Sequence, residues 1–180
     1  RSLQEQVEER TRQIRTAAEV AQGIATSFNL EELLQTTAKL IVERFGFYHA
    51  GIFLIDPSGT RASLRAAHGP SAQEMLKRGH QLEVGSDSIV GWASANFKPR
   101  VAADVDQDPV YRKNPLLPYT RAEAGFPIAL GEAVLGVLDV QSTQPRVFDE
   151  EMVIVLQTLA NQIATAIQNT TLSNSESMDA

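Results

Sequence analysis

The 180-residue chain contains no cysteine. This absence excludes disulfides, thiolate metal sites, cysteine nucleophiles and chromophores attached through a thioether bond. It also fits a reducing compartment, and we expect a cytoplasmic domain, whose parent protein can still be tethered to a membrane.

Other signals of catalysis or metal binding are also missing. None of the three histidines is three or four residues from another, so no metal-ligand spacing emerges. The aspartates at 104, 106 and 108 alternate, but the stretch lacks the glycine and the final glutamate of a calcium loop. No G-x-S-x-G elbow or glycine-rich phosphate loop is present. We therefore expect no catalytic residue, no metal and no enzyme activity in this chain, and the sequence identifies no cofactor.

Positive charge and long apolar runs are scarce. Sixteen Lys and Arg against twenty-two Asp and Glu give a net charge of −6, and no cation follows Arg146. Nucleic-acid binding needs a basic face, and a membrane-surface helix needs basic residues on its polar side. No run approaches the roughly 20 apolar residues of a membrane span. We expect neither nucleic acid nor direct membrane contact.

What the chain does contain begins with a heptad pattern over residues 2–28. Two sets of positions alternate at spacings of four and three residues. One set is Leu3, Arg10, Ala17 and Ile24, and the other is Val7, Ile14, Ala21 and Phe28. The pattern predicts a helical linker or coiled-coil segment over 1–28. The alternative is an amphipathic helix that packs on its own domain. Since a helical pattern is already under way at Arg1, we expect a piece of a longer protein.

The middle of the chain predicts a mixture of helices and strands. Asn29 and Glu32 suit the start of a helix over 30–45. Strands are predicted at 47–55 and 61–68 around the turn 56–59, with short helices at 71–78 and 87–96 and short strands at 81–84 and 99–103. Residues 104–109 read as a loop, and residues 110–120 are expected to be irregular and are the best candidate for a lid.

The last third predicts two apolar strands that meet at Leu130–Glu132, then a long helix over about 149–171 and a flexible tail at 173–180. Apolar positions on this helix form a stripe broad enough to cover a sheet on one side and meet a partner helix on the other. Short strand connections favour an antiparallel sheet. We predict an α+β fold: a central antiparallel sheet with helices packed on one face, flanked by long N- and C-terminal helices.

Three motifs carry a family resemblance over about residues 32–169. They are the helix start Ile89–Trp92, the run 101–105 with 108–111 behind it, and the hairpin with Phe148–Glu151. Together they closely resemble a GAF domain, a small-molecule-sensing and dimerising module of signalling proteins. The resemblance implies a domain over 29–172. The signature of cyclic-nucleotide-binding members is missing, and the bilin-binding and methionine-sulfoxide-reducing members depend on cysteine.

The resemblance also implies where a ligand would sit: between the sheet and the helical middle, under the 104–120 loop. Aromatic residues would form the wall and the closure, and charged residues would make polar contacts; the candidates are Trp92, Asp104, Tyr111, Arg121, Glu123 and Phe126. For the aromatic residues the alternative is plain core packing, and for Arg121 with Glu123 it is an ordinary ion pair.

The implied function is a non-catalytic sensory and dimerisation domain of a cytoplasmic signal-transduction protein, most plausibly a multidomain histidine kinase. Its partners would be neighbouring domains of the parent chain, a small molecule, and a second copy bound through the terminal helices. The expected interface residues are Val7, Ile14, Ala21, Leu156, Leu159, Ile163 and Ile167. The alternative function is a structural dimerisation spacer without a ligand.

Overall fold

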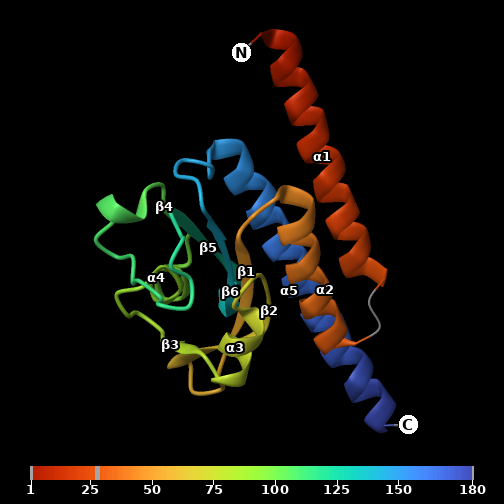
Figure 1. Cartoon of the computed structure of the whole chain (residues 1–180). Helices are drawn as coiled ribbons and strands as arrows, with labels where there is room; N and C mark the ends of the chain where they lie inside the picture. The colour runs from red at the N-terminus through yellow and green to blue at the C-terminus, as the bar shows by residue number, and fades with distance from the viewer. Residues whose placement is uncertain (1, 27–28, 180) are drawn as a thin grey trace.

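The computed structural model describes the backbone of residues 2–26 and 29–179 and the side chains of residues 2–25 and 29–170. A six-stranded antiparallel sheet forms its centre, in the order β3-β2-β1-β6-β5-β4 (Figure 1). The strands are β1 (His49–Ile55), β2 (Arg61–His68), β3 (Gln81–Glu83), β4 (Arg100–Ala102), β5 (Ala122–Leu130) and β6 (Ala133–Ser142). The predicted α+β fold with a central antiparallel sheet is confirmed.

Two hairpins build the middle of the sheet. In the first, Asp56 closes the turn between β1 and β2: its Oδ1 accepts hydrogen bonds from the backbone N–H groups of Thr60 (2.9 Å) and Arg61 (3.2 Å). In the second, Gly131 adopts a φ of 59° between β5 and β6, a conformation that favours glycine. β6 then pairs with β1, so the two hairpins join edge to edge.

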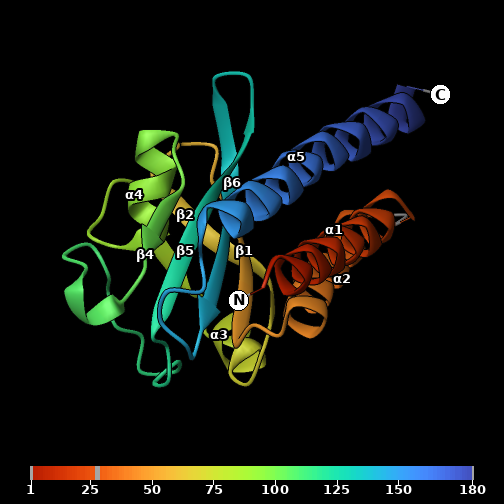
Figure 2. The same cartoon turned by 90° about the horizontal axis from the view of Figure 1, so that it is seen from above.

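Two long helices, α2 (Leu30–Phe45) and α5 (Glu150–Asp179), cover one face of the sheet, and a third, α1 (Leu3–Thr26), packs on these two helices (Figure 2). α2 begins as predicted, because the Asn29 side chain accepts a hydrogen bond from the backbone N–H of Glu32 at 2.8 Å. Ile52, Phe126 and Leu138 point from the sheet into the core that these helices share. Successive strand residues alternate between faces. Their neighbours therefore point to the opposite face.

That opposite face carries the short elements α3 (Ala72–Lys77), α4 (Ile89–Asn96) and the 3₁₀ helix η1 (Val105–Gln107), together with the long loop. Phe53, Leu64 and Val137 pack there against Met75 and Val90. Both faces of the sheet are therefore apolar. This explains why short helices accompany the loops on the face opposite the long helices.

α1 divides into two halves with different surroundings. Val20 and Ile24 are buried in the core of the domain, so this half packs on its own chain as the alternative interpretation stated. In the other half Leu3, Val7 and Ile14 are exposed. Residue 28, the last position of the predicted heptad seam, lies outside the described residues. The C-terminal half of α1 thus contributes to the core of the domain.

α5 corrects two expectations. Leu156, Leu159 and Ile163 are at most 1% exposed, because this stripe faces the sheet and the other long helices. They are core residues of this domain, so a second copy could contact only other positions of α5. The backbone also stays helical through residues 173–179, where a flexible tail was expected, since no glycine or proline follows Arg146 to end the helix.

Within the described residues, no helix has both the length and the apolar character needed to cross a membrane.

Candidate functional site

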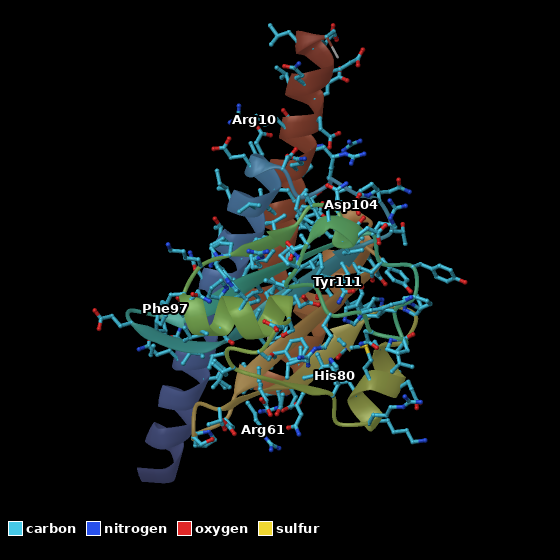
Figure 3. The ribbon with its side chains drawn as sticks, turned by 90° about the vertical axis from the view of Figure 1, so that its left-hand side faces the viewer. Arg10, Arg61, His80, Phe97, Asp104 and Tyr111 are labelled. Carbon is cyan, nitrogen blue, oxygen red and sulfur yellow. The ribbon has the colours of Figure 1, made fainter. Side chains whose placement is uncertain are left out.

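A cavity of about 300 Å³ lies between the sheet and the elements on its loop-bearing face. Strands β1, β5 and β6 form its floor, α3 and α4 contribute its sides, and residues 112–116 of the long loop lie over it. Figure 3 looks onto this face, with Tyr111 in the loop segment above and His80 below. The location is the one that the sequence predicted for a ligand.

The polar groups of the floor come from two neighbouring rows of the sheet. In one row Gln141 of β6 lies between Glu123 of β5 and His49 of β1. In the next row Asp139 has a glycine on each side, Gly125 on β5 and Gly51 on β1. A Cβ on Gly51 would lie 3.2 Å from His49 Nε2, and one on Gly125 would lie 3.1 Å from Ile89 Cγ2. The glycines therefore leave room for the histidine and for α4.

Gln141 connects the two acids. Its Nε2 donates to Glu123 Oε2 at 3.0 Å and to Asp139 Oδ2 at 2.8 Å, and its Oε1 accepts from Thr120 Oγ1 at 2.7 Å. The amide thus uses both of its N–H groups. Asp139 Oδ1, however, is buried and has no hydrogen-bond partner among the described residues. Since buried polar atoms are nearly always paired, this oxygen marks a place where a donor is needed.

The floor carries less negative charge than its two acids suggest. Glu123 is 7% exposed. Burial raises its pKa well above the ordinary value, and the charge of Asp139, a side-chain hydrogen bond with Asp139 and the charge of Asp108 raise it further. Two carboxylates so close together cannot easily both ionise. The protonated form of Glu123 is therefore favoured.

Two histidines stand beside the acids. Burial lowers the pKa of His49, and Asp139 opposes this shift. Both ring nitrogens of His49 are buried without a hydrogen-bond partner in the described part of the chain. Burial likewise lowers the pKa of His80, whose ring lies edge-on to Phe53 with the centroids 5.8 Å apart. The neutral imidazole of His80 therefore lines this side of the cavity, and that of His49 lies buried beside the acids.

The walls are apolar and the mouth is basic. Phe53, Met75 and Val90 are buried side chains in the wall. Arg112 and Lys113, both exposed, lie in the loop over the cavity and form no ion pair within the described residues. A third cation at the cavity, Arg78, is held by Glu74 through a hydrogen bond of 2.7 Å.

The loop is anchored on the C-terminal side of its basic segment. Leu117 is 1% exposed and packs in the core of this face. Asn114 Oδ1 accepts from the backbone N–H of Leu116 at 2.9 Å, and Ser71 Oγ donates to the carbonyl oxygen of Leu116. The segment 112–116 therefore has a defined shape over the cavity.

Of the six predicted ligand residues, only Glu123 lines the cavity. Trp92 lies outside it and is half-buried on α4, with the Arg100 guanidinium 5.2 Å from its ring centroid. Arg100 also donates twice to Asp108, at 2.9 and 2.8 Å. Trp92 is therefore part of a clamp at the base of the loop and, contrary to expectation, does not form the wall of this cavity.

The other predicted residues have structural surroundings of their own. Phe126 is fully buried on the helix-covered face, because its strand parity is opposite to that of Glu123. Asp104 caps η1, and Arg121 approaches it at 4.0 Å, so that Arg121 pairs with Asp104 rather than with a ligand. Tyr111 packs beside the cavity on Ile89, and burial followed by the charge of Glu123 raises its pKa to about 12.

Asp139, Gln141 and His49 were not predicted as site residues. A signal was available for two of them: an acid and an amide interrupt an otherwise apolar strand at alternate positions, which places both on one face. His49 carries no such signal.

Two further observations delimit the site. A hollow of about 620 Å³ lies between α1 and α5, where the lining is apolar or uncharged. No group of three or more histidine and acidic side chains suited to a metal ion occurs in the described residues.

A six-stranded antiparallel sheet with long helices on one face and a loop-covered cavity on the other defines an α+β domain of the sensory type. The family model described as GAF domain matches residues 29–168, and the chain belongs to this family. Comparison with curated protein sequences gives no significant match.

Solved structures show the same fold. The GAF domain of a phosphoenolpyruvate-protein phosphotransferase from Coxiella burnetii is 21% identical, with a TM-score of 0.82 over 92% of this chain and 98% of that one. A free methionine-R-sulfoxide reductase from Neisseria meningitidis, in complex with its substrate, is 23% identical, with a TM-score of 0.79 over 89% and 91%. The GAF domain of a phosphoenolpyruvate-protein phosphotransferase from Acinetobacter is 22% identical, with a TM-score of 0.76 over 91% of this chain and 97% of that one. At these identities the likeness establishes the fold.

Proposed function

We propose that this chain is the sensory module of a larger cytoplasmic signalling protein, such as a histidine kinase, and that it binds a small molecule in the sheet cavity. The observation that carries this proposal is the floor of the cavity. A carboxylate oxygen of Asp139 is buried next to Glu123 and Gln141 and has no partner among the described residues, and an unpaired buried oxygen costs free energy in a plain core. The volume is at the lower end of the range for small-molecule sites.

The signal would travel through the sheet to the long helices. Glu123 faces the cavity, while Ala124 and Phe126 on the same strand face the helix layer. Gln157 on α5 also donates to the carbonyl oxygen of Pro127 on β5 at 3.0 Å. A shift of β5 therefore reaches α5 directly, and α5 contacts α1 near the exposed half of that helix through Arg10 and Glu151, 3.6 Å apart. A ligand biases this arrangement only by its differential affinity for two states.

We further propose that the module does no covalent chemistry. Reductases of methionine sulfoxide share the fold. A thiol-dependent reduction needs a cysteine, and this chain has none. The cavity instead offers groups suited to holding a charged molecule.

A specific observation favours a second function, the structural dimerisation spacer. Leu3, Val7 and Ile14 are 77%, 56% and 63% exposed and lie at heptad spacing. Such a row on one helix is suited to a parallel coiled coil with a second copy. The sensory function includes this homodimer together with ligand binding, whereas the spacer function consists of the homodimer alone.

A thermal-shift screen distinguishes the two functions. The purified chain is heated with individual nucleotides, carboxylic acids, amines, amino acids and haem over a range of concentrations. A sensor shows a rise in the midpoint that grows with ligand concentration. A flat response to every compound contradicts the sensory function and leaves the spacer.

A further inference from the structure

We propose that the cavity selects a small zwitterion, such as an α-amino acid, with its ammonium group on Asp139 and Glu123 and its anionic group toward Arg112 and Lys113. This inference rests on the proposed sensory function and names the ligand class of the same site.

The floor calls for a donor with more than one N–H. Asp139 Oδ1 is buried and unpartnered in the described part of the chain, and Glu123 lines the same cavity one row away. Gln141 cannot supply further donors, because both of its N–H groups are already used. An ammonium group has three donors and a positive charge. It therefore satisfies both acids at once, which a single hydroxyl cannot do.

The floor also favours a cation over a neutral donor. A hydrogen bond between a charged donor and a carboxylate is roughly twice as strong as one between neutral groups. Among the described residues, no cationic side chain lies on the floor itself. The other titratable neighbours of the two acids are His49 and His80, and burial lowers the pKa of each. A ligand cation would thus meet acids and neutral rings.

The mouth has the opposite charge. Arg112 and Lys113 line the cavity from the loop and have no ion-pair partner in the described residues, while Arg78 is already paired with Glu74. A carboxylate is a good match for a free guanidinium. A ligand with an ammonium at one end and a carboxylate at the other fits this division, and its hydrocarbon part would contact Phe53 and Met75.

The test uses matched compounds that differ by one charged group. Each protein amino acid is measured by thermal shift, and every one that binds is compared by calorimetry with two analogues. One analogue lacks the amine and the other lacks the carboxylate; for leucine these are 4-methylpentanoic acid and 3-methylbutylamine. We expect at least one amino acid to bind, and each of its analogues to bind about 10-fold to 100-fold more weakly.

Variants assign the contacts. Asp139→Asn keeps the shape of the side chain and removes its charge, and we expect it to abolish measurable binding. Arg112→Gln changes an exposed loop residue, so folding is not at stake, and we expect about 10-fold weaker binding. Glu132→Gln, in the exposed turn between β5 and β6, makes a comparable loss of negative charge away from the cavity and should bind like the parent chain.

Each of the other outcomes contradicts the ligand class, the orientation or the sensory function. If neutral or purely anionic compounds bind and zwitterions do not, the ligand class is wrong while the sensory function stands. If folded Asp139→Asn or Arg112→Gln binds an amino acid as tightly as the parent chain, the proposed orientation is wrong. If no compound of any class binds, both the ligand class and the sensory function are wrong.

Discussion

Glu123 and Asp139 lie on neighbouring antiparallel strands and are joined by the Gln141 amide, which donates to both at 3.0 and 2.8 Å. Among the described side chains, Gln141 alone donates hydrogen bonds to both acids. The arrangement holds two carboxyl groups close together on the floor of a cavity. Much of the behaviour expected of this domain follows from that pairing.

Replacing Gln141 should destabilise the domain. Gln141→Leu keeps a side chain of similar size but removes the donor to each acid and the acceptor for Thr120. Buried polar groups left without partners cost about 1–3 kcal/mol each, so we expect a loss of about 2–4 kcal/mol. Urea unfolding followed by circular dichroism measures this change. Gln144→Leu, at an exposed position, is the control; equal stability of the two variants would contradict the structural role of the amide.

The stability of the domain should depend on pH through Glu123. Its pKa is raised in the folded chain, so its contribution is fully present below the ordinary value of 4.5 and is lost as the pH rises through the folded pKa. Asp139, Asp108 and Tyr111 face this group. The free energy of unfolding of the parent chain minus that of Glu123→Gln should therefore fall as the pH rises from about 4 to 8.

The two histidines act in the opposite direction. Since burial lowers the pKa values of His49 and His80, their contribution is present above 6.5 and is lost as the pH falls through the folded pKa values. Both histidines remain in Glu123→Gln, so to first order their effect cancels in the difference. Glu132→Gln supplies the control curve. A difference that stays constant, or one that grows with pH, would show that Glu123 is not held in its protonated form.

Arg100 should hold the base of the loop. Arg100→Met removes the two hydrogen bonds to Asp108 and the cation over Trp92, and Asp108 then retains the backbone N–H of Val110. Because this pair is largely shielded from solvent, we expect a loss of about 1–2 kcal/mol and faster hydrogen exchange in residues 104–112.

Arg121→Met is the matched control for the clamp. Arg121 lies 4.0 Å from Asp104 and its side chain is 48% exposed, so the same change should alter stability by less than about 0.5 kcal/mol. Unchanged exchange in Arg100→Met, or equal effects of the two substitutions, would mean that the loop does not depend on this clamp.

The exposed half of α1 should mediate self-association. Val7→Glu combined with Ile14→Glu places charges in the seam and should convert dimers into monomers by light scattering. Arg15→Glu makes the same net change of charge on an exposed position outside the seam and should remain dimeric. A parent chain that is monomeric at every concentration, or a double variant that stays dimeric, would exclude this contact.

The extent of correct prediction differed from element to element. Asn29 as a helix cap and the hairpin around Gly131 were predictable, because caps and tight turns depend on neighbours in sequence. The apolar stripe of α5 was predictable too, but the sequence did not show which surface would cover it. Leu159 was expected in a dimer interface and is 1% exposed inside the domain. Periodicity reports that a face is apolar and leaves its partner undefined.

The candidate site shows the same division. Alternation along a strand places Asp139 and Gln141 on one face, yet both faces of this sheet are apolar, so the sequence did not show which face carries the cavity. Phe126 was misplaced for this reason. Strand register then sets Asp139 between Gly51 and Gly125. These residues are far apart in the chain, and no local pattern reports their meeting.

By itself, the sequence determined the composition of the elements, their order, the family and the absence of thiol chemistry. Only the tertiary structure decided which polar side chains share the floor, which oxygen of Asp139 has no partner among the described residues, and which apolar stripe is core. The physical reason is that propensity and periodicity act over a few neighbours. Burial and pKa shifts depend on strands brought together from distant parts of the chain.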